Sequence, residues 1–245
     1  MSHRIFLAGA SGVIGKRLIP LLVRRGHHVT GTTRSSANAV ALEALGIVPR
    51  VVDVFDAAAL AEAVLEARPD IVIHQLTDLP QSTATPATPE ALTGNARIRD
   101  EGTRNLVAAA VAAGVRRMVA QSITWGYAPG ALPHDEAAPL DLNAEGVRGV
   151  TVNGMAALER QVLSAPGLTG IVLRYGRLYG PETGVDLPPS SMPLHVDAAA
   201  YAAFLAMDHG EAGIFNVAEP SNEITTDKIS RQLGWDWRFR LADAS

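Results

Sequence analysis

Residues 5–15 read IFLAGASGVIG, an apolar run that leads into three evenly spaced glycines, Gly9, Gly12 and Gly15. The apolar run is typical of a buried strand, and a helical pattern follows it as far as Gly26. Glycine suits the turn between them because it accepts positive φ angles and lets a diphosphate reach the backbone and the positive helix end. The stretch therefore predicts a dinucleotide site, although a purely structural turn would show the same pattern.

Length and composition indicate a folded domain that handles small molecules. The chain has 245 residues, of which 47% are hydrophobic and 19% are charged, and it contains no apolar run long enough to span a bilayer. Its net charge of -4 offers no electrostatic footprint for nucleic acid or an anionic membrane. We therefore expect a single domain, residues 1–245, that binds a small-molecule substrate and neither nucleic acid nor membrane. The N-terminus lacks the layout of a signal peptide, which favours a cytoplasmic location.

The residue after the second expected strand bears on the choice of cofactor. That strand covers residues 28–33, HVTGTT, and Arg34 follows it directly. An acidic side chain there would bind the hydroxyls of the adenosine ribose, whereas an arginine can pair with a 2′-phosphate. Arg34 thus favours NADP over NAD, unless it is simply a solvated loop residue. Asp53, at the end of a third strand expected at residues 48–52, either accepts a hydrogen bond from the adenine amino group or caps the next helix.

Strand and helix patterns alternate along the rest of the first half. Helices are expected at residues 37–45, 57–67 and 90–113, and strands at residues 71–76 (IVIHQL) and 115–121. This alternation predicts an α/β fold with a Rossmann-like, doubly wound parallel sheet.

Ligands of such sheets bind beyond the carboxyl ends of the strands. Residues 77–89, TDLPQSTATPATP, follow one strand there and form either a mobile flap or an ordinary long loop. Residues 122–146 follow the next strand and carry Trp125, Tyr127 and His134, so substrate groups are expected near them. His74 is more often a hydrogen-bonded core residue than a catalytic one, and no partner lies at metal-ligand spacing, so we expect no metal.

Seven motifs spread over most of the chain carry a family likeness: GASGVIG, Asp53, IVIHQL, EGTRNLVAAA at 101–110, LRYGRLYGP at 173–181, PLHVDAAAYAAFLAM at 193–207 and IFNVAEP at 214–220. Together they resemble the extended short-chain dehydrogenase/reductase family, the group of nucleotide-sugar epimerases and dehydratases. The likeness implies a set of cofactor-binding positions on this chain, namely Gly9, Ser11, Gly12, Val13, Ile14, Gly15, Arg34, Asp53, Val54, Gln75, Leu76, Thr77 and Tyr175.

The family's catalytic pair is absent from this chain. In the family, a tyrosine four residues before a lysine moves a proton at the substrate oxygen while hydride moves to or from nicotinamide. Aligning that helix through Glu159 puts Thr151 in the tyrosine position and Met155 in the lysine position. The resemblance leaves Ser122, Thr124 and Tyr127 as candidate polar groups, although Tyr127 is as readily interpreted as an aromatic residue packed under the loop.

The same likeness sets expectations for the C-terminal part. Arg174 is expected to face nicotinamide and substrate, or else to form a structural ion pair. A short lobe is expected from residues 176–194 and 219–245, and only 14 residues separate Gly180 from His195, which favours a substrate smaller than a nucleotide sugar. Trp235 and Trp237 are expected to cover the core. A homodimer through the helices at residues 90–113 and 148–164 is implied as an option.

Three functions remain open on the sequence. We favour an NADP-binding oxidoreductase with an atypical active site that acts on a small carbonyl or hydroxyl compound. The missing pair directly supports the alternative of a non-catalytic NADP(H)-binding sensor or regulator. The third is a lyase or isomerase that uses the same scaffold without net redox chemistry.

Overall fold

The structure is a computed structural model that describes residues 2–79 and 86–241. Its main sheet has seven strands in the order β3-β2-β1-β4-β5-β6-β9, and every neighbouring pair is parallel. The strands are β1 (Arg4–Ala8), β2 (His28–Thr33), β3 (Val48–Val51), β4 (Ile71–His74), β5 (Arg117–Ile123), β6 (Thr169–Tyr175) and β9 (Gly213–Val217). The predicted α/β fold with a doubly wound parallel sheet is confirmed.

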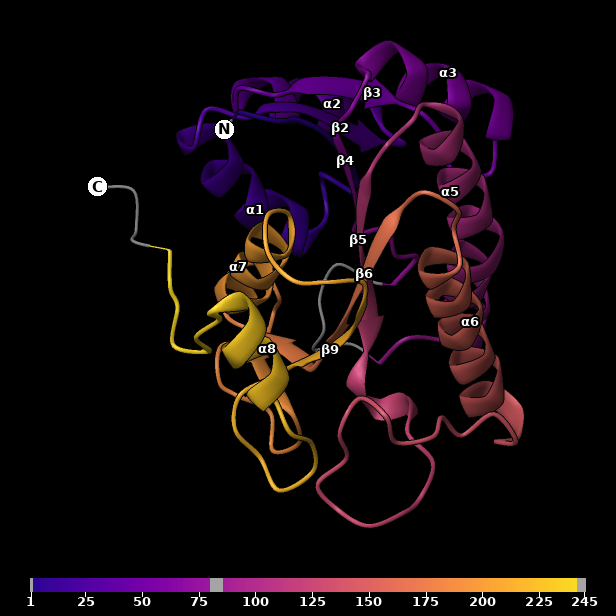
Figure 1. Cartoon of the computed structure of the whole chain (residues 1–245), viewed down its shortest axis with the longest axis vertical. Coiled ribbons are helices and arrows are strands. Elements are labelled where there is room, and N and C mark those ends of the chain that lie inside the picture. The colour runs from indigo at the N-terminus through magenta and orange to yellow at the C-terminus, as the bar shows by residue number, and fades with distance from the viewer. Residues whose placement is uncertain (1, 80–85, 242–245) are drawn as a thin grey trace.

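Helices cover both faces of this sheet (Figure 1). On one face lie α1 (Val13–Arg24), α7 (Val196–Ala206) and α8 (Asp227–Leu233), and on the other lie α3 (Ala57–Ala67), α5 (Thr103–Ala112) and α6 (Gly146–Leu163). The edge strand β3 is flanked by α2 (Ser36–Ala44), and α4 (Pro89–Arg97) leads into α5. Each face buries its own apolar cluster, because strand residues alternate between the two sides. In the part of the chain that is described, no helix is long and apolar enough to cross a membrane.

Apart from shifts of one residue at element ends, the differences between expected and observed elements in the first half concern three elements. The helix expected at residues 90–113 contains a π-helical turn, Ile98–Gly102, between α4 and α5. The strand expected at 115–121 begins two residues later, at Arg117, because the buried Val115 lies in the turn and its N–H donates to the Ala110 carbonyl. The strand expected at 71–76 ends at His74. Residues 80–85 of the loop expected at 77–89 lie outside the described residues.

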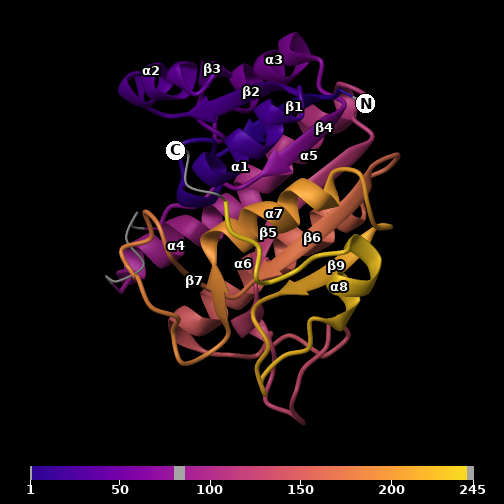
Figure 2. The same cartoon turned by 90° about the vertical axis from the view of Figure 1, so that its left-hand side faces the viewer.

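The C-terminal part adds a small second sheet and a long final segment. Strands β7 (Arg177–Tyr179) and β8 (Pro193–His195) pair in parallel. After α8 the chain runs over α7 toward α1 (Figure 2), and it contacts β7 through Arg240 and Tyr179. Trp235 anchors this segment, because its buried indole donates from Nε1 to the Ala198 carbonyl at 2.9 Å. Trp237 is half-buried against the same apolar cluster.

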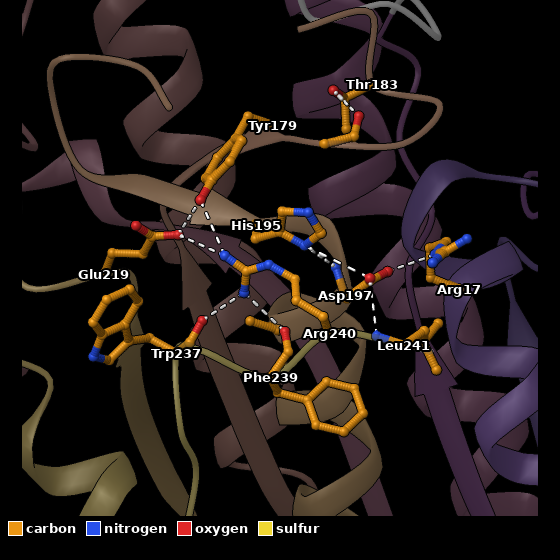
Figure 3. Close-up of polar contacts among 12 residues, drawn as sticks. Arg17, Tyr179, Thr183, His195, Asp197, Glu219, Trp237, Phe239, Arg240 and Leu241 are labelled. Carbon is orange, nitrogen blue, oxygen red and sulfur yellow. Dashed lines mark hydrogen bonds and ion pairs between the residues drawn. The ribbon is translucent and has the colours of Figure 1, made fainter. Parts of the chain in front are cut away.

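A polar cluster fixes the end of that segment (Figure 3). The Arg240 guanidinium donates to the Tyr179 hydroxyl at 3.2 Å and lies 3.8 Å from the Glu219 carboxylate. Tyr179 in turn donates to Glu219 at 2.6 Å, and burial, together with this carboxylate, raises the pKa of Tyr179 to about 12. The Leu241 N–H donates to Asp197, which also accepts from Arg17 of α1. The final segment is thereby tied to α1, α7 and the small sheet at once.

Candidate functional site

The glycine turn after β1 requires glycine for two separate reasons. Gly9 has a φ of +88°, and a Cβ there would lie 2.6 Å from the backbone carbonyl of Gln75 on the neighbouring chain segment. A Cβ at Gly15 would collide with the Gly9 and Ala10 carbonyl oxygens. Gly12 caps α1, and its N–H donates to the Gly9 carbonyl at 3.1 Å. The turn therefore brings bare backbone and the start of α1 to the carboxyl edge of the sheet.

A cavity of about 390 Å³ opens beside this turn. It lies beyond the carboxyl ends of β1, β2, β3 and β4, which is where open α/β sheets bind ligands. Its polar lining comes mainly from Ser11, Thr32, Thr33, Arg34, Ser35, Asn38, Asp53, Gln75 and Thr77. Its apolar lining includes Val13, Val52, Val54, Phe55, Leu60, Leu76, Leu79 and Ile98. The cavity thus combines an apolar slot with a hydroxyl-rich end, as an adenosine and its phosphates would require.

Threonines at the end of β2 hold the two sides of the cavity in place. The Gly9 N–H donates to Thr32 Oγ1 at 3.2 Å, and the Ser35 N–H donates to Thr33 Oγ1 at 3.2 Å. Asp53 accepts from the Phe55 N–H at 2.9 Å, so its carboxylate organises the turn after β3 while also lining the cavity. Arg34 reaches across the opening and pairs with Asp78.

Most of the residues expected to bind cofactor line this cavity. They are Gly9, Ser11, Gly12, Val13, Arg34, Asp53, Val54, Gln75, Leu76 and Thr77. Ile14 and Gly15 are buried in the first turn of α1 and do not line it. Tyr175 is buried as well; its hydroxyl accepts from Gln75 Nε2 at 3.4 Å, and burial raises its pKa. Asn38, Phe55 and Ile98 were missed, and for Ile98 no sequence signal exists because the π-helical turn places it.

The three candidate catalytic residues are buried away from the cavity lining. Ser122 Oγ donates to Glu159 at 2.8 Å, and Thr124 Oγ1 donates to the Tyr175 carbonyl at 3.3 Å. The Tyr127 hydroxyl donates to Asn216 Oδ1 at 2.6 Å, and burial raises the pKa of Tyr127 above its ordinary value. Their catalytic role stays a prediction, and each hydroxyl already has a partner within the protein.

Met155, which the resemblance predicts at the position of the family's lysine, has a side chain without acid–base function. Met155 is fully buried, and its thioether fills the space under Gly126, where a Cβ would collide with it. The two lysines of the chain are engaged elsewhere. Lys16 pairs with Glu182 at 2.7 Å, and Lys228 donates to the Ile214 carbonyl at 2.7 Å.

A buried ion pair supports the sheet below the candidate catalytic residues. Arg174 on β6 makes two hydrogen bonds to Glu159 on α6, at 2.9 and 2.7 Å, and both side chains are almost fully buried. The Arg174 guanidinium also lies 4.9 Å from the centre of the Tyr127 ring. Bonding to Glu159 raises the pKa of Arg174 in spite of its burial. Of the two expectations for Arg174, the structure shows the structural ion pair.

His74 lies in the core, hydrogen-bonded to Thr103 at 3.0 Å. Burial, together with the charge of Arg99, lowers its pKa to about 4. Within residues 2–79 and 86–241, no group of three or more metal-ligating side chains gathers.

Comparisons with known proteins agree with this architecture. A model of the NAD dependent epimerase/dehydratase family matches residues 5–212. A 3-diazoavenalumate denitrifying reductase of Streptomyces is 42% identical over 237 residues, which covers 88% of this chain and 76% of the relative. A dTDP-4-dehydrorhamnose reductase of Streptomyces griseus is 31% identical over 179 residues, or 72% of this chain and 50% of the relative.

Solved structures share the fold at low sequence identity. The Bordetella bronchiseptica enzyme WbmG, in complex with NAD and UDP, superposes with a TM-score of 0.76 at 18% identity, covering 98% of this chain and 91% of that one. A UDP-glucose 4-epimerase of Thermotoga maritima, with UDP-glucose, also reaches a TM-score of 0.76, at 17% identity and with 96% and 94% coverage.

Proposed function

The chain belongs to the NAD-dependent epimerase/dehydratase family, and we propose that it is an NADPH-dependent reductase whose substrate needs no proton from the protein. Three lines support the proposal: the cavity beside the glycine turn, the residues that replace the catalytic pair, and the reductase at 42% identity.

The cavity fits the adenosine and diphosphate end of a dinucleotide. Bare backbone at Gly9 and Gly12 and the positive end of α1 suit a diphosphate, and the slot of Val54, Phe55 and Ile98 suits an adenine ring. Thr33 stands where an acidic ribose ligand would be needed for NAD, and Arg34 supplies the cation for a 2′-phosphate. These residues favour NADP as the cofactor, and NADPH bound there would supply a hydride.

The observation that carries the reaction type is the burial of Met155 under Gly126, at the position where the resemblance predicts the family's lysine. Hydride transfer to a carbonyl leaves an alkoxide that must be protonated, which is the task of a tyrosine with a lowered pKa. Here Tyr127 has a raised pKa and a committed hydroxyl, so it is a poor proton donor or acceptor at neutral pH. A substrate that accepts hydride without gaining a proton needs no proton-donating residue in the protein.

An arenediazonium group is such a substrate, and the relative's name describes the loss of nitrogen from a diazo compound. Hydride from NADPH forms the new C–H bond at the ring carbon. The C–N bond breaks, its electron pair leaves with N₂, and the products are the arene, N₂ and NADP⁺. Atoms and charge balance with no proton transferred, so the protein has to bind and orient two reactants and to exclude water. We therefore propose a small arenediazonium carboxylate as the substrate class.

The test follows the hydride and the nitrogen together. Purified protein is mixed with NADPH deuterated at C4 of the nicotinamide and with arenediazonium salts that carry a carboxylate side chain. We expect protein-dependent release of N₂ and deuterium at the ring carbon that lost nitrogen, measured by mass spectrometry against a protein-free control. The Gly9→Ala variant is the matched control, because it should remove the dinucleotide site.

The sensor alternative predicts a different result from the same samples. A protein that binds NADPH tightly yet accelerates neither diazonium nor carbonyl reduction beyond the protein-free rate would contradict the reductase. That result would favour the non-catalytic NADP(H)-binding protein, which the buried candidate residues also fit.

A further inference from the structure

An ion pair joins two chain segments that border the cavity. Arg34 follows β2 and Asp78 follows β4, and the two strands flank β1 on either side. The Arg34 guanidinium donates to Asp78 Oδ1 at 3.1 Å. Because the glycine turn continues from β1, the pair reaches over the turn from one wall to the other. Thr77 and Leu79, on either side of Asp78, both line the cavity.

Two residues of α4 hold Asp78 in this position. The Asp78 N–H donates to Asn95 Oδ1 at 3.1 Å, and Asn95 is buried in α4. Gly94, which directly precedes Asn95, leaves the room that the carboxylate needs, since a Cβ there would lie 2.5 Å from Asp78 Oδ2. The carboxylate is therefore positioned beside Arg34 by two residues of α4 that do not themselves line the cavity.

We propose that Asp78 competes with the 2′-phosphate of NADPH for Arg34 and thereby limits the preference for NADPH over NADH. The inference rests on the proposed function, because it assigns a role to a residue of the same cofactor site. Binding of NADPH requires Arg34 to exchange the Asp78 carboxylate for the phosphate, and it leaves a carboxylate near a dianionic group. NADH has no 2′-phosphate, so it binds without this exchange.

The expected change in NADPH affinity follows from the solvent exposure of the Arg34–Asp78 ion pair. The side chains of Arg34 and Asp78 are 60% and 39% exposed, so water and salt screen their attraction. Exposed ion pairs of this kind change an equilibrium by about two- to fivefold. Removing the carboxylate charge should therefore tighten NADPH binding by about that factor and leave NADH binding unchanged.

The experiment is a fluorescence titration of NADPH and of NADH with the wild-type protein and with Asp78→Asn. The amide keeps the size of the side chain and removes its charge. Asp236→Asn, in the C-terminal segment outside the cavity lining, makes the same change in net charge and serves as the control. Arg34→Ala and the double variant Arg34→Ala with Asp78→Asn complete a cycle that isolates the interaction between the two residues.

We expect tighter NADPH binding in Asp78→Asn alone, and no further change when Asp78→Asn is added to Arg34→Ala. Equal gains for NADPH and NADH, a gain of the same size in Asp236→Asn, or weaker NADPH binding would each overturn the inference. Failure of the proposed function is distinguishable from failure of this inference. A wild-type protein that binds neither nucleotide has no cofactor site, and one that binds NADPH without turnover contradicts the reductase while the binding comparison still tests Asp78. If the wild-type protein binds NADPH and the variants do not differ from it, the inference alone is wrong.

Discussion

Gly9 and Gly26 both have positive φ angles, but only Gly9 lies against another chain segment. The φ angles are +88° and +77°, and no atom lies within 4 Å of a Cβ placed at Gly26. Gly26→Ala should therefore lower the free energy of unfolding only by the backbone strain, about 1 kcal/mol. Gly9→Ala adds a collision with the Gln75 backbone and should cost about 3 kcal/mol and abolish NADPH binding.

Urea unfolding and an NADPH titration of both variants check this prediction. Equal losses of stability would show that the close approach at Gly9 contributes nothing. Retained NADPH binding in a folded Gly9→Ala protein would remove the glycine turn from the cofactor site.

His74 predicts a pH dependence of stability. Its folded pKa of about 4 lies below the ordinary value of 6.5, so between these pH values the unfolded chain binds the proton and the folded protein does not. Stability therefore rises with pH across this window and falls as pH drops from about 6.5 toward 4. The shift amounts to about 3 kcal/mol in full. His74→Asn should flatten the curve of unfolding free energy against pH, measured by urea titration, and a parallel curve would contradict the assignment.

At the scale of elements, the ion pair between α6 and β6 is expected to behave as a unit. Glu159→Gln leaves the Arg174 guanidinium buried without a countercharge and should destabilise the protein by about 3–5 kcal/mol. Replacing both members, by Glu159→Leu with Arg174→Met, should restore part of that loss because the Arg174 guanidinium is then no longer buried without its countercharge. Chemical unfolding of the three variants tests this. A double variant less stable than Glu159→Gln would show that packing, and not the unpaired charge, dominates.

The C-terminal segment is expected to depend on one tryptophan. Trp235→Ala removes a buried ring and the hydrogen bond to the Ala198 carbonyl, and should lower the free energy of unfolding by about 3–5 kcal/mol. Trp237 is only half-buried and its ring lies under Arg238, so Trp237→Ala should cost about 1 kcal/mol. Thermal unfolding of the two variants gives the comparison, and equal costs would mean that the segment is not anchored at Trp235.

The sequence predicted elements well wherever the signal is local. The strand at residues 28–33 and the helix at 57–67 have the expected bounds, because turn residues and strong propensities mark their ends. The start of β5 was misplaced because Val115 is as apolar as a strand residue although it belongs to the turn. The π-helical turn at Ile98–Gly102 has no marker in composition, since packing against α6 and Val54 decides it.

In the candidate site, too, the residues with a local sequence signal were predicted and their distant partners were not. The residues of the glycine turn and those after β2 and β3 were predicted, because each follows the end of a strand. The partners of these residues come from distant parts of the chain, so spacing could not reveal them. Asp78 beside Arg34, Glu159 beside Ser122 and Asn216 beside Tyr127 became visible only in the fold.

At the scale of the whole molecule, the cofactor cavity and the C-terminal segment occupy different halves. The cavity lies over β1 to β4, whereas the segment packs on α7 and β7. Helix α1 connects the halves, because its N-terminal turn borders the cavity and its Arg17 binds Asp197 of α7 at 2.5 Å. Asp197 is also the acceptor for Leu241. If residues 1–245 form a single cooperative domain, as predicted, cofactor binding would stabilise both halves against unfolding.

The tryptophans make this prediction measurable. All three, Trp125, Trp235 and Trp237, lie outside the cavity lining and in the C-terminal half. At a hundredfold excess over its Kd, NADP⁺ should add about 2.7 kcal/mol to the free energy of unfolding. For a domain of this size the midpoint then rises by about 5–10 °C. If the chain is one cooperative unit, tryptophan fluorescence and far-UV circular dichroism should report the same rise. A rise seen by circular dichroism but not by fluorescence would mean that the C-terminal half unfolds independently of the cofactor site.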